Sequence, residues 1–491
     1  MEQLKPKLDD DVLNRKLTKE QIEYYQNIDS AFADYTKFED RERPEDRLKM
    51  REAFLADEIR LPSYNYHQLD DLYFNQQVID KKRDIYESVM ELEAAKNNPA
   101  NNQAELELYA SFHELRLKKI MLVEAARNLQ SHSLNQSDYE ANKRAFERIN
   151  QEVYGEYDFV EFANLIGVEA KAVDDFEPKT DLASKIKAEL DGFLRNVERK
   201  DERSELLDAE EMKLAQDCVL QRYKSVLEVV PDTGDDVKYQ AADCQAIMTQ
   251  ALEAGGLAEH GWRVEVNPAK SNVSTSTVKK LITLPVTTER DANQLRRLII
   301  HEQEVHARRG HNGRMAGSDI LRSGTANYAD VEEGLAVMLE CIVAGDFDNL
   351  SFKRAKNRYL TAGLALSGDG LKRDARDVFE VMWRLVAVQD SKNGEITPDD
   401  VDSARDRAYD FIENAYRGTG FYMQEVIYSK LKIYYEGILK NAKFFKDNIY
   451  NLDEALDSAM IGKYNHTDEQ ESQAVHDLIL ANHKGQLDTE G

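Results

Sequence analysis

Apolar positions recur at helical spacing along most of the chain. One run lies between residues 71 and 96, where the side chains on one helical face are Leu72, Ile79, Tyr86, Val89 and Leu92. The residues around Pro99 break this pattern, and it resumes from Leu106. Two helical runs separated by a short polar break predict an antiparallel helical hairpin.

A different pattern appears only over residues 261–268 and 279–286. In both segments apolar residues are concentrated as in short β-strands, and a segment rich in Ser, Thr and Asn (271–277) separates them. The sequence therefore predicts a small β-unit with a loop at 271–277, directly before a helix. The strand at 279–286 would offer an edge against which an extended peptide can lie.

Composition supports a mainly helical fold. The 491 residues include only nine prolines and 23 glycines, and 32% of them are charged, which favours long helices over a turn-rich β architecture. The predicted fold class is therefore mainly α with a small β-sheet (α+β).

Charge and cysteine content narrow the choice of partners and location. A net charge of −27 argues against a nucleic-acid partner, since phosphate binding needs a basic surface. No apolar run approaches the roughly 18 residues that cross a bilayer, and the charged N-terminus has no apolar signal segment. Three widely spaced cysteines form neither a disulfide framework nor a thiolate metal site. We expect a cytoplasmic protein without a membrane partner.

The candidate chemistry begins in the helix that follows the β-unit. Its buried face continues into His301, Glu302 and His306, and burying such groups is costly unless they bind something. The familiar zinc-binding spacing on a helix places two histidines four residues apart. Five residues apart, an ideal helix separates them by about 140°. Both can therefore reach one metal only if the helix widens locally into a π-bulge or ends between them.

A second helix supplies acidic residues for such a site. Glu332 and Glu333 begin an amphipathic segment, and Glu333 follows His306 by 27 residues. A carboxylate in this place would complete a two-histidine, one-carboxylate zinc site with an open fourth position. Successive helical residues point about 100° apart, so only one of the two glutamates can face the metal. The spacing leaves the choice between them open.

Four segments together resemble a known family. HEQEVHARRGHNG, VEEGLAV, YRGTG and QEVIYSKLKIYYEGI, in this order within roughly residues 240–440, are similar to the microtubule-associated tyrosine carboxypeptidases and their bacterial relatives. The resemblance implies a zincin-like peptidase core that binds one Zn²⁺ per chain through His301, His306 and Glu333, with Glu302 as catalytic base. It also implies release of C-terminal aromatic residues, Tyr or Phe, from peptides or proteins. Glu332 stands where the bacterial motif usually has glutamine.

With this resemblance the chain divides into three predicted parts. A helical N-terminal region spans 1–165, a zinc metallopeptidase domain spans 166–450, and an acidic C-terminal helix or tail spans 451–491.

Peptide hydrolysis at such a site assigns further roles. Zinc with an open position lowers the pKa of a water towards about 7 and polarises the scissile carbonyl, and Glu302 would take the water's proton. Candidate substrate-binding residues are Tyr328 and Tyr416 as oxyanion donors and Arg417 for the terminal carboxylate. Arg322 and Lys430 are second choices for that carboxylate.

Two other functions fit the same residues. One is another peptidase with this motif, either an endopeptidase or a dipeptidyl-peptidase type that would need an acidic anchor for the substrate's amine. The other is a non-catalytic regulatory or scaffold protein, whose structural zinc would be closed by a fourth ligand such as His311 or Glu332.

Overall fold

The computed structural model describes residues 44–64, 76–98, 102–129, 136–201, 206–233, 237–270 and 272–489. Most of them are helical, and the strands are few and short, so the predicted α+β class is confirmed. No helix among these residues combines the length and the apolar character that a bilayer span requires. Pro99 and Leu72 lie outside the described residues.

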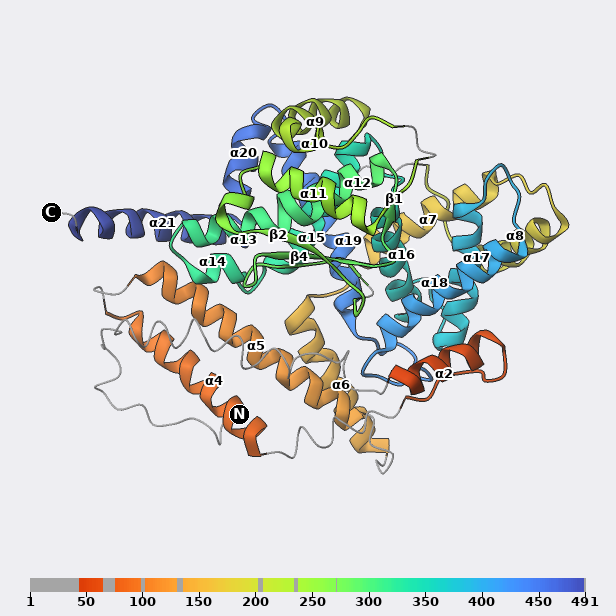
Figure 1. Ribbon diagram of the computed structural model, residues 1–491. Helices are drawn as coiled ribbons and strands as arrows, with labels where there is room; N and C mark the ends of the chain where they lie inside the picture. Colours follow the sequence, from red (N-terminus) through yellow and green to blue (C-terminus); the bar gives the residue numbers. More distant parts are fainter. Residues whose placement is uncertain are drawn as a thin grey trace.

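Most helices pack around one large apolar core (Figure 1). They are α2 (Pro44–Leu55), α7 (Phe159–Asp175), α8 (Asp181–Leu194), α9 (Ala209–Arg222), α10 (Lys224–Leu227), α11 (Ala241–Ala254), α15 (Tyr328–Ala344), α16 (Leu350–Ala365), α17 (Ala375–Asp390), α18 (Pro398–Tyr416), α19 (Ile433–Asp447) and α20 (Leu452–Ala459). The short helices η3 (Ala258–His260) and η5 (Ser429–Lys432) connect parts of this body. Within it α15 packs against α9, α16, α19 and the helix α12 (Ala292–Leu298), so residues on α15 are held from several sides.

A second apolar core forms under the predicted hairpin. Here α4 (Gln76–Ala95), α5 (Gln103–Leu129) and α6 (Gln136–Tyr154) lie side by side, as the helical spacing predicted (Figure 1). Apolar residues of α14 (Asp319–Ser323), of the segment 423–428 and of α21 (Glu469–Thr489) complete this core. Residues from all three predicted parts of the chain therefore share it, while α2 from the N-terminal part, and α7, which crosses the predicted boundary at 165, join the large core.

The two predicted strands are present, but their setting differs from the prediction. β2 (Arg263–Asn267) and β4 (Leu281–Pro285) pair in parallel, and β3 (Ser274–Ser276) adds antiparallel to β4, giving the order β2-β4-β3. The expected loop at 271–277 is corrected at Ser274–Ser276, where the alternating Ser and Thr side chains suit a short, partly exposed strand. With β4 in the centre, the open edge beside the chemistry belongs to β3 and not to 279–286. A separate antiparallel pair joins β1 (Tyr239–Gln240) to β5 (Glu289–Arg290).

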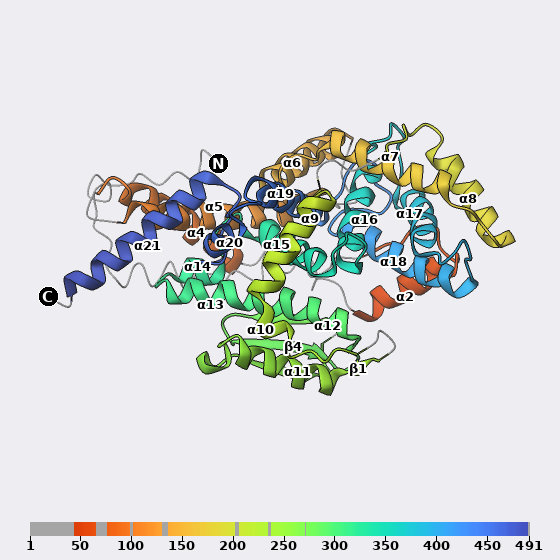
Figure 2. The same cartoon turned by 90° about the horizontal axis from the view of Figure 1, so that it is seen from above.

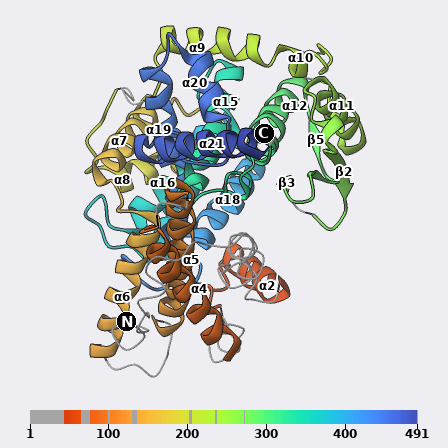
Figure 3. The same ribbon diagram turned by 90° about the vertical axis from the view of Figure 1, so that its left-hand side faces the viewer.

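One long helix leads from the sheet into the site. It consists of α12 (Ala292–Leu298), η4 (Ile299–Ala307) and α13 (Arg308–Met315) without interruption. Asp291 caps its start, because the carboxylate accepts from the Gln294 backbone while the Gln294 side chain bonds back to Asp291. The sheet and α11 lie together at one side of the molecule, with α12 between them and α15 (Figures 2 and 3).

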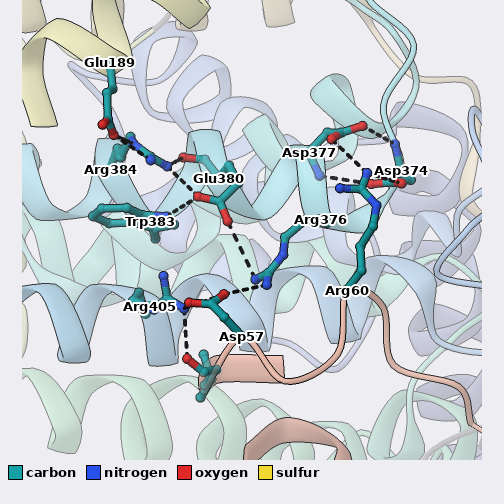
Figure 4. Close-up of polar contacts among 11 residues, drawn as sticks. Asp57, Arg60, Glu189, Asp374, Arg376, Asp377, Glu380, Trp383, Arg384 and Arg405 are labelled. Carbon is teal, nitrogen blue, oxygen red and sulfur yellow. Dashed lines mark hydrogen bonds and ion pairs between the residues drawn. The ribbon is translucent and has the colours of Figure 1, made fainter. Parts of the chain in front are cut away.

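Helix α2 is fastened to the main body by ionic contacts (Figure 4). Arg376 and Arg405 both donate to Asp57, at 2.6 and 3.2 Å, just after α2 ends. Arg60 donates to Asp374 at 2.7 Å, at the start of α17. These contacts hold α2 and the residues that follow it against α17 and α18.

The glycine of the EEGLA segment has a packing role. An added Cβ at Gly334 would lie 2.1 Å from the backbone carbon of Gly437, and one at Gly437 would lie 2.0 Å from the carbonyl oxygen of Asp330. Helices α15 and α19 therefore cross so closely that neither position has room for a side chain. The obstructing atoms are backbone, which cannot move aside as a flexible side chain would.

We therefore predict that Gly334→Ala lowers the free energy of unfolding by about 1–3 kcal/mol, the usual cost of overpacking a core. Gly192→Ala is the matched control, since Gly192 lies in α8 with no neighbour within 4 Å of its added Cβ. That control should gain about 0.5–1 kcal/mol from helix propensity. Chemical denaturation of both variants tests the prediction, and equal stability of Gly334→Ala and wild type would contradict it.

Candidate metal centre

The helix widens at the histidines. Residues Ile299–Ala307 form a nine-residue π-helix, in which backbone hydrogen bonds run from i to i+5. Side chains five residues apart then share one face, and the rings of His301 and His306 lie 4.9 Å apart between centroids. Of the two arrangements that the five-residue spacing allows, the structure has the π-helical one, and the helix does not end between the histidines.

Glu333 joins the two histidines from α15. One ligand atom from each of His301, His306 and Glu333 lies within 4.8 Å of the others. The Oε1 atom of Glu333 is 3.7 Å from the Nε2 atom of His306. Neighbouring ligands of a tetrahedral zinc with bonds near 2.1 Å are about 3.4 Å apart, so this pair is close to metal-binding separation.

The neighbouring Glu332 faces the other way. Its side chain is buried, with Oε1 at 2.8 Å from His306 Nδ1 and at 2.6 Å from the Lys463 ammonium. Arg309, fully buried, donates to Oε2 at 3.2 Å. Burial opposes ionisation, yet Lys463, His306 and Arg309 outweigh it and hold the pKa of Glu332 far below its usual range. Its oxygens are thus engaged behind the histidine and do not close the site.

His301 is held in the same manner by Glu340. The Nδ1 atom of His301 lies 2.6 Å from Glu340 Oε1, and the Ser351 hydroxyl donates to Glu340 Oε2 at 2.9 Å. Burial disfavours a charged imidazole, but the Glu340 hydrogen bond and charge prevail and raise the pKa of His301 to about 10. A carboxylate on Nδ1 fixes the ring and leaves Nε2 as the metal-binding atom.

Glu302 lies beside the cluster. Its side chain is only 8% exposed, and its Oε2 accepts a hydrogen bond from the Thr275 hydroxyl at 2.6 Å. Thr275 belongs to β3, so the edge strand of the sheet orients this carboxylate. His301 feels its charge directly, which places the carboxylate near the ligand cluster.

The predicted substrate-binding residues lie in different parts of the structure. Tyr328, in the first turn of α15, is brought to the cluster: burial and then the charges of Glu332 and Glu333 raise the pKa of its hydroxyl above the usual value. Tyr416 is fully buried and stacked on Phe421, away from the histidines. Arg417 follows α18 and lines a small cavity of about 40 Å³.

The remaining candidates are also accounted for. Arg322 pairs with Asp319 at 2.8 Å, on α14. The His311 ring lies against His260 at 4.4 Å between centroids. Of the described residues, only His301, His306 and Glu333 form a group that could hold a metal ion, so neither His311 nor Glu332 acts as a fourth ligand.

Sequence reasoning missed the residues that support the ligands. Glu340 follows Glu333 by seven residues, so the two share a helix face, and this spacing was a usable signal. Thr275 was hidden in an apparent loop. Lys463 lies in the part taken for a tail, and no local pattern connects it with Glu332.

Two histidines and one glutamate lie around a single point, each histidine is backed by a buried carboxylate, and the group could hold one metal ion. A family model described as microtubule-associated tyrosine carboxypeptidase matches residues 201–482. The chain belongs to this family, as its motifs suggested, and membership implies a carboxypeptidase, a hydrolase acting on a peptide or protein. No curated protein and no solved structure matches the chain.

The two adjacent glutamates should behave differently on substitution. Glu333→Gln removes a ligand and nothing else, so we predict a folded protein with little bound metal. Glu332→Gln leaves Lys463 and Arg309 without their anion, so we predict a loss of stability of about 3–5 kcal/mol. Its metal affinity should fall by about 10- to 100-fold, the usual cost of losing a group that orients a ligand.

Metal content by elemental analysis and unfolding by denaturant separate the two effects. At metal concentrations that saturate the wild type, Glu332→Gln should still hold metal and Glu333→Gln should not. The reverse order would exchange the roles of the two residues.

Proposed function

We propose that this chain is a zinc-dependent carboxypeptidase that removes single aromatic residues, Tyr or Phe, from the C-termini of peptides or proteins. Family membership supports the carboxypeptidase class. The observation that carries the zinc-hydrolase assignment is the position of Glu302. It is an acidic side chain next to a candidate ligand, held by Thr275 and free of any ligand role, as a catalytic base requires.

The donor set fits zinc better than other common metals. Two imidazole nitrogens and one carboxylate oxygen are borderline donors, whereas magnesium and calcium prefer oxygen alone. His301, His306 and Glu333 would hold the ion, and Glu340 and Glu332 would keep both imidazoles in the required tautomer. Zinc with an open fourth position supplies a Lewis acid and lowers the pKa of a water towards about 7.

The protein's own residues then move the proton. Glu302 would take a proton from the attacking water and pass it to the leaving amine. The Thr275 hydrogen bond occupies Oε2 and keeps the carboxylate in one orientation, so Oε1 is the atom available for the proton. Tyr328 would donate to the developing oxyanion, because its raised pKa keeps the hydroxyl protonated at neutral pH.

The edge strand would align the substrate. β3 uses one side to pair with β4 and lies against η4. A peptide added along its other side would run past Glu302, since Thr275 in the same strand touches that carboxylate.

The rivals predict different behaviour. A dipeptidyl peptidase would read the substrate's N-terminus, and an endopeptidase would ignore both ends. A scaffold protein would bind metal without hydrolysis, and it would give no reason for Thr275 to hold Glu302 beside the ligands.

Glu302→Gln is the test of catalysis. It removes the proton acceptor and keeps all three ligands, so we predict retained zinc and retained fold with activity reduced by about 100- to 10,000-fold. Peptide cleavage by wild type and variant, with zinc content measured alongside, checks this. Unchanged activity would remove Glu302 from the mechanism, and loss of zinc would make it part of the metal site.

Substrate direction needs a separate test. Wild type should release single residues from peptides that end in Tyr or Phe, and amidation of the C-terminus should block release because the terminal charge is then absent. Mass spectrometry of matched free and amidated peptides distinguishes the cases. Equal cleavage of both would indicate an endopeptidase, release from the N-terminus would indicate the dipeptidyl-peptidase type, and no cleavage by zinc-loaded protein would favour the scaffold.

A further inference from the structure

A cavity of about 500 Å³ lies between the N-terminal hairpin region and the start of α15. Lys119 of α5, the end of α6, Lys430 and the segment 326–330 contribute to its walls. It thus brings together residues before 201, outside the part matched by the family, and the helix that carries Glu333.

Lys119 stands in this wall without an acidic partner. The part of the chain that the structure describes places neither a hydrogen bond nor an ion pair on its ammonium group, and the charges that act on it are those of Lys430 and Arg116. Burial, together with these two cations, lowers the pKa of Lys119 to about 8. A half-buried cation among cations is destabilising unless an anion accompanies it.

The acidic side chains of the same cavity are already paired. Asp330 accepts from Lys440 at 2.5 Å, and Glu152 pairs with Arg148 at 3.3 Å. The cavity therefore has a cationic wall in a protein whose net charge is −27. This local reversal of charge would attract an anion that the rest of the surface repels.

Helix α15 connects the wall of the cavity with the metal centre. Asp330 in its wall and Glu333 in the centre are three residues apart on α15, about 4.5 Å along the helix axis. Tyr328 connects the two electrostatically, because its hydroxyl feels both the glutamates of the centre and Arg116 of α5. A peptide bound over the metal could therefore extend into the cavity. Lys430 also lines the smaller cavity that contains Arg417.

We propose that this cavity binds a carboxylate of the peptide substrate, with Lys119 as the residue that pairs with it and Lys430 at its side. The proposal rests on the carboxypeptidase function and makes helix α5 part of the substrate site. The carboxylate can come from the substrate's C-terminus or from an acidic side chain before it.

Direct peptide binding tests the proposal without relying on turnover. The protein is the full chain, zinc-loaded, with Glu302→Gln to prevent cleavage, and the probe is a fluorescent Tyr-terminated peptide with glutamates before the tyrosine. Lys119→Gln is compared with Lys118→Gln, the adjacent lysine on α5, which is ion-paired with Glu114 at 2.9 Å and does not line the cavity. Lys119→Arg keeps the positive charge.

Lys119→Gln should weaken binding by about 10- to 100-fold, as expected for loss of a charged hydrogen bond, while Lys118→Gln should change it less than about twofold, in line with an exposed ion pair. Lys119→Arg should retain most of the affinity. The effect of Lys119→Gln should vanish with an amidated peptide if the terminal carboxylate is bound. It should vanish with a Glu-to-Gln peptide if an acidic side chain is bound.

The proposal would be overturned by any one of three results. Lys119→Gln binds the peptide as tightly as its parent, Lys118→Gln weakens binding as much as Lys119→Gln does, or the parent binds no peptide. Failure of the proposed function is recognised separately. If the wild type and Lys119→Gln both cleave peptides with the same KM, the carboxypeptidase function stands and the carboxylate pocket is excluded. If peptide binding depends on the carboxylate and on Lys119 but the wild type hydrolyses no peptide, the carboxylate pocket is supported and the hydrolase function is excluded.

Discussion

The five-residue separation of His301 and His306 is the constraint on which the centre depends. An α-helix would turn one of the two rings away, so the chain hydrogen-bonds from i to i+5 through Ile299–Ala307. A helix of this kind is poorly packed and rare, and here it is held from both ends and from the side. Regular helix continues before and after it, while β3 and α15 lie against it.

Buried charge supports this π-helical segment. Glu332 and Glu340 each hold one imidazole by its Nδ1 atom, so the two rings are fixed from behind. An isolated buried carboxylate would be costly, and Lys463 and Arg309 offset that cost at Glu332. Arg309 also donates to the carbonyls of Ala459 and Tyr464, which ties the C-terminal segment to the centre. The residues beyond 450 thus have a structural part in the site, although the sequence predicts for them only an acidic helix or tail outside the peptidase domain.

Close helix packing sets where Glu333 lies. Gly334 lets α15 approach the backbone of α19 at Gly437, and the preceding residue, Glu333, then faces the histidines. The glycine of the motif is therefore explained by the space between two helices rather than by chemistry. The N-terminal hairpin approaches the first turn of α15, and cationic residues line a cavity there.

Local order in the sequence was enough to predict a mainly helical fold, β2 and β4, and the candidate residues His301, Glu302 and His306. The reason is that periodicity and motif spacing are properties of neighbouring residues. The five-residue spacing also excluded a regular helix through both histidines, and it left either a π-bulge or a helix end between them. Which of Glu332 and Glu333 faces the histidines was decided by how α15 packs. Three further features join segments that are 27 to more than 200 residues apart. They are the pairing of Lys463 with Glu332, the pairing of Thr275 with Glu302, and the position of Lys119 near the start of α15. Such contacts arise only when the chain has folded, since no local pattern links residues across that distance.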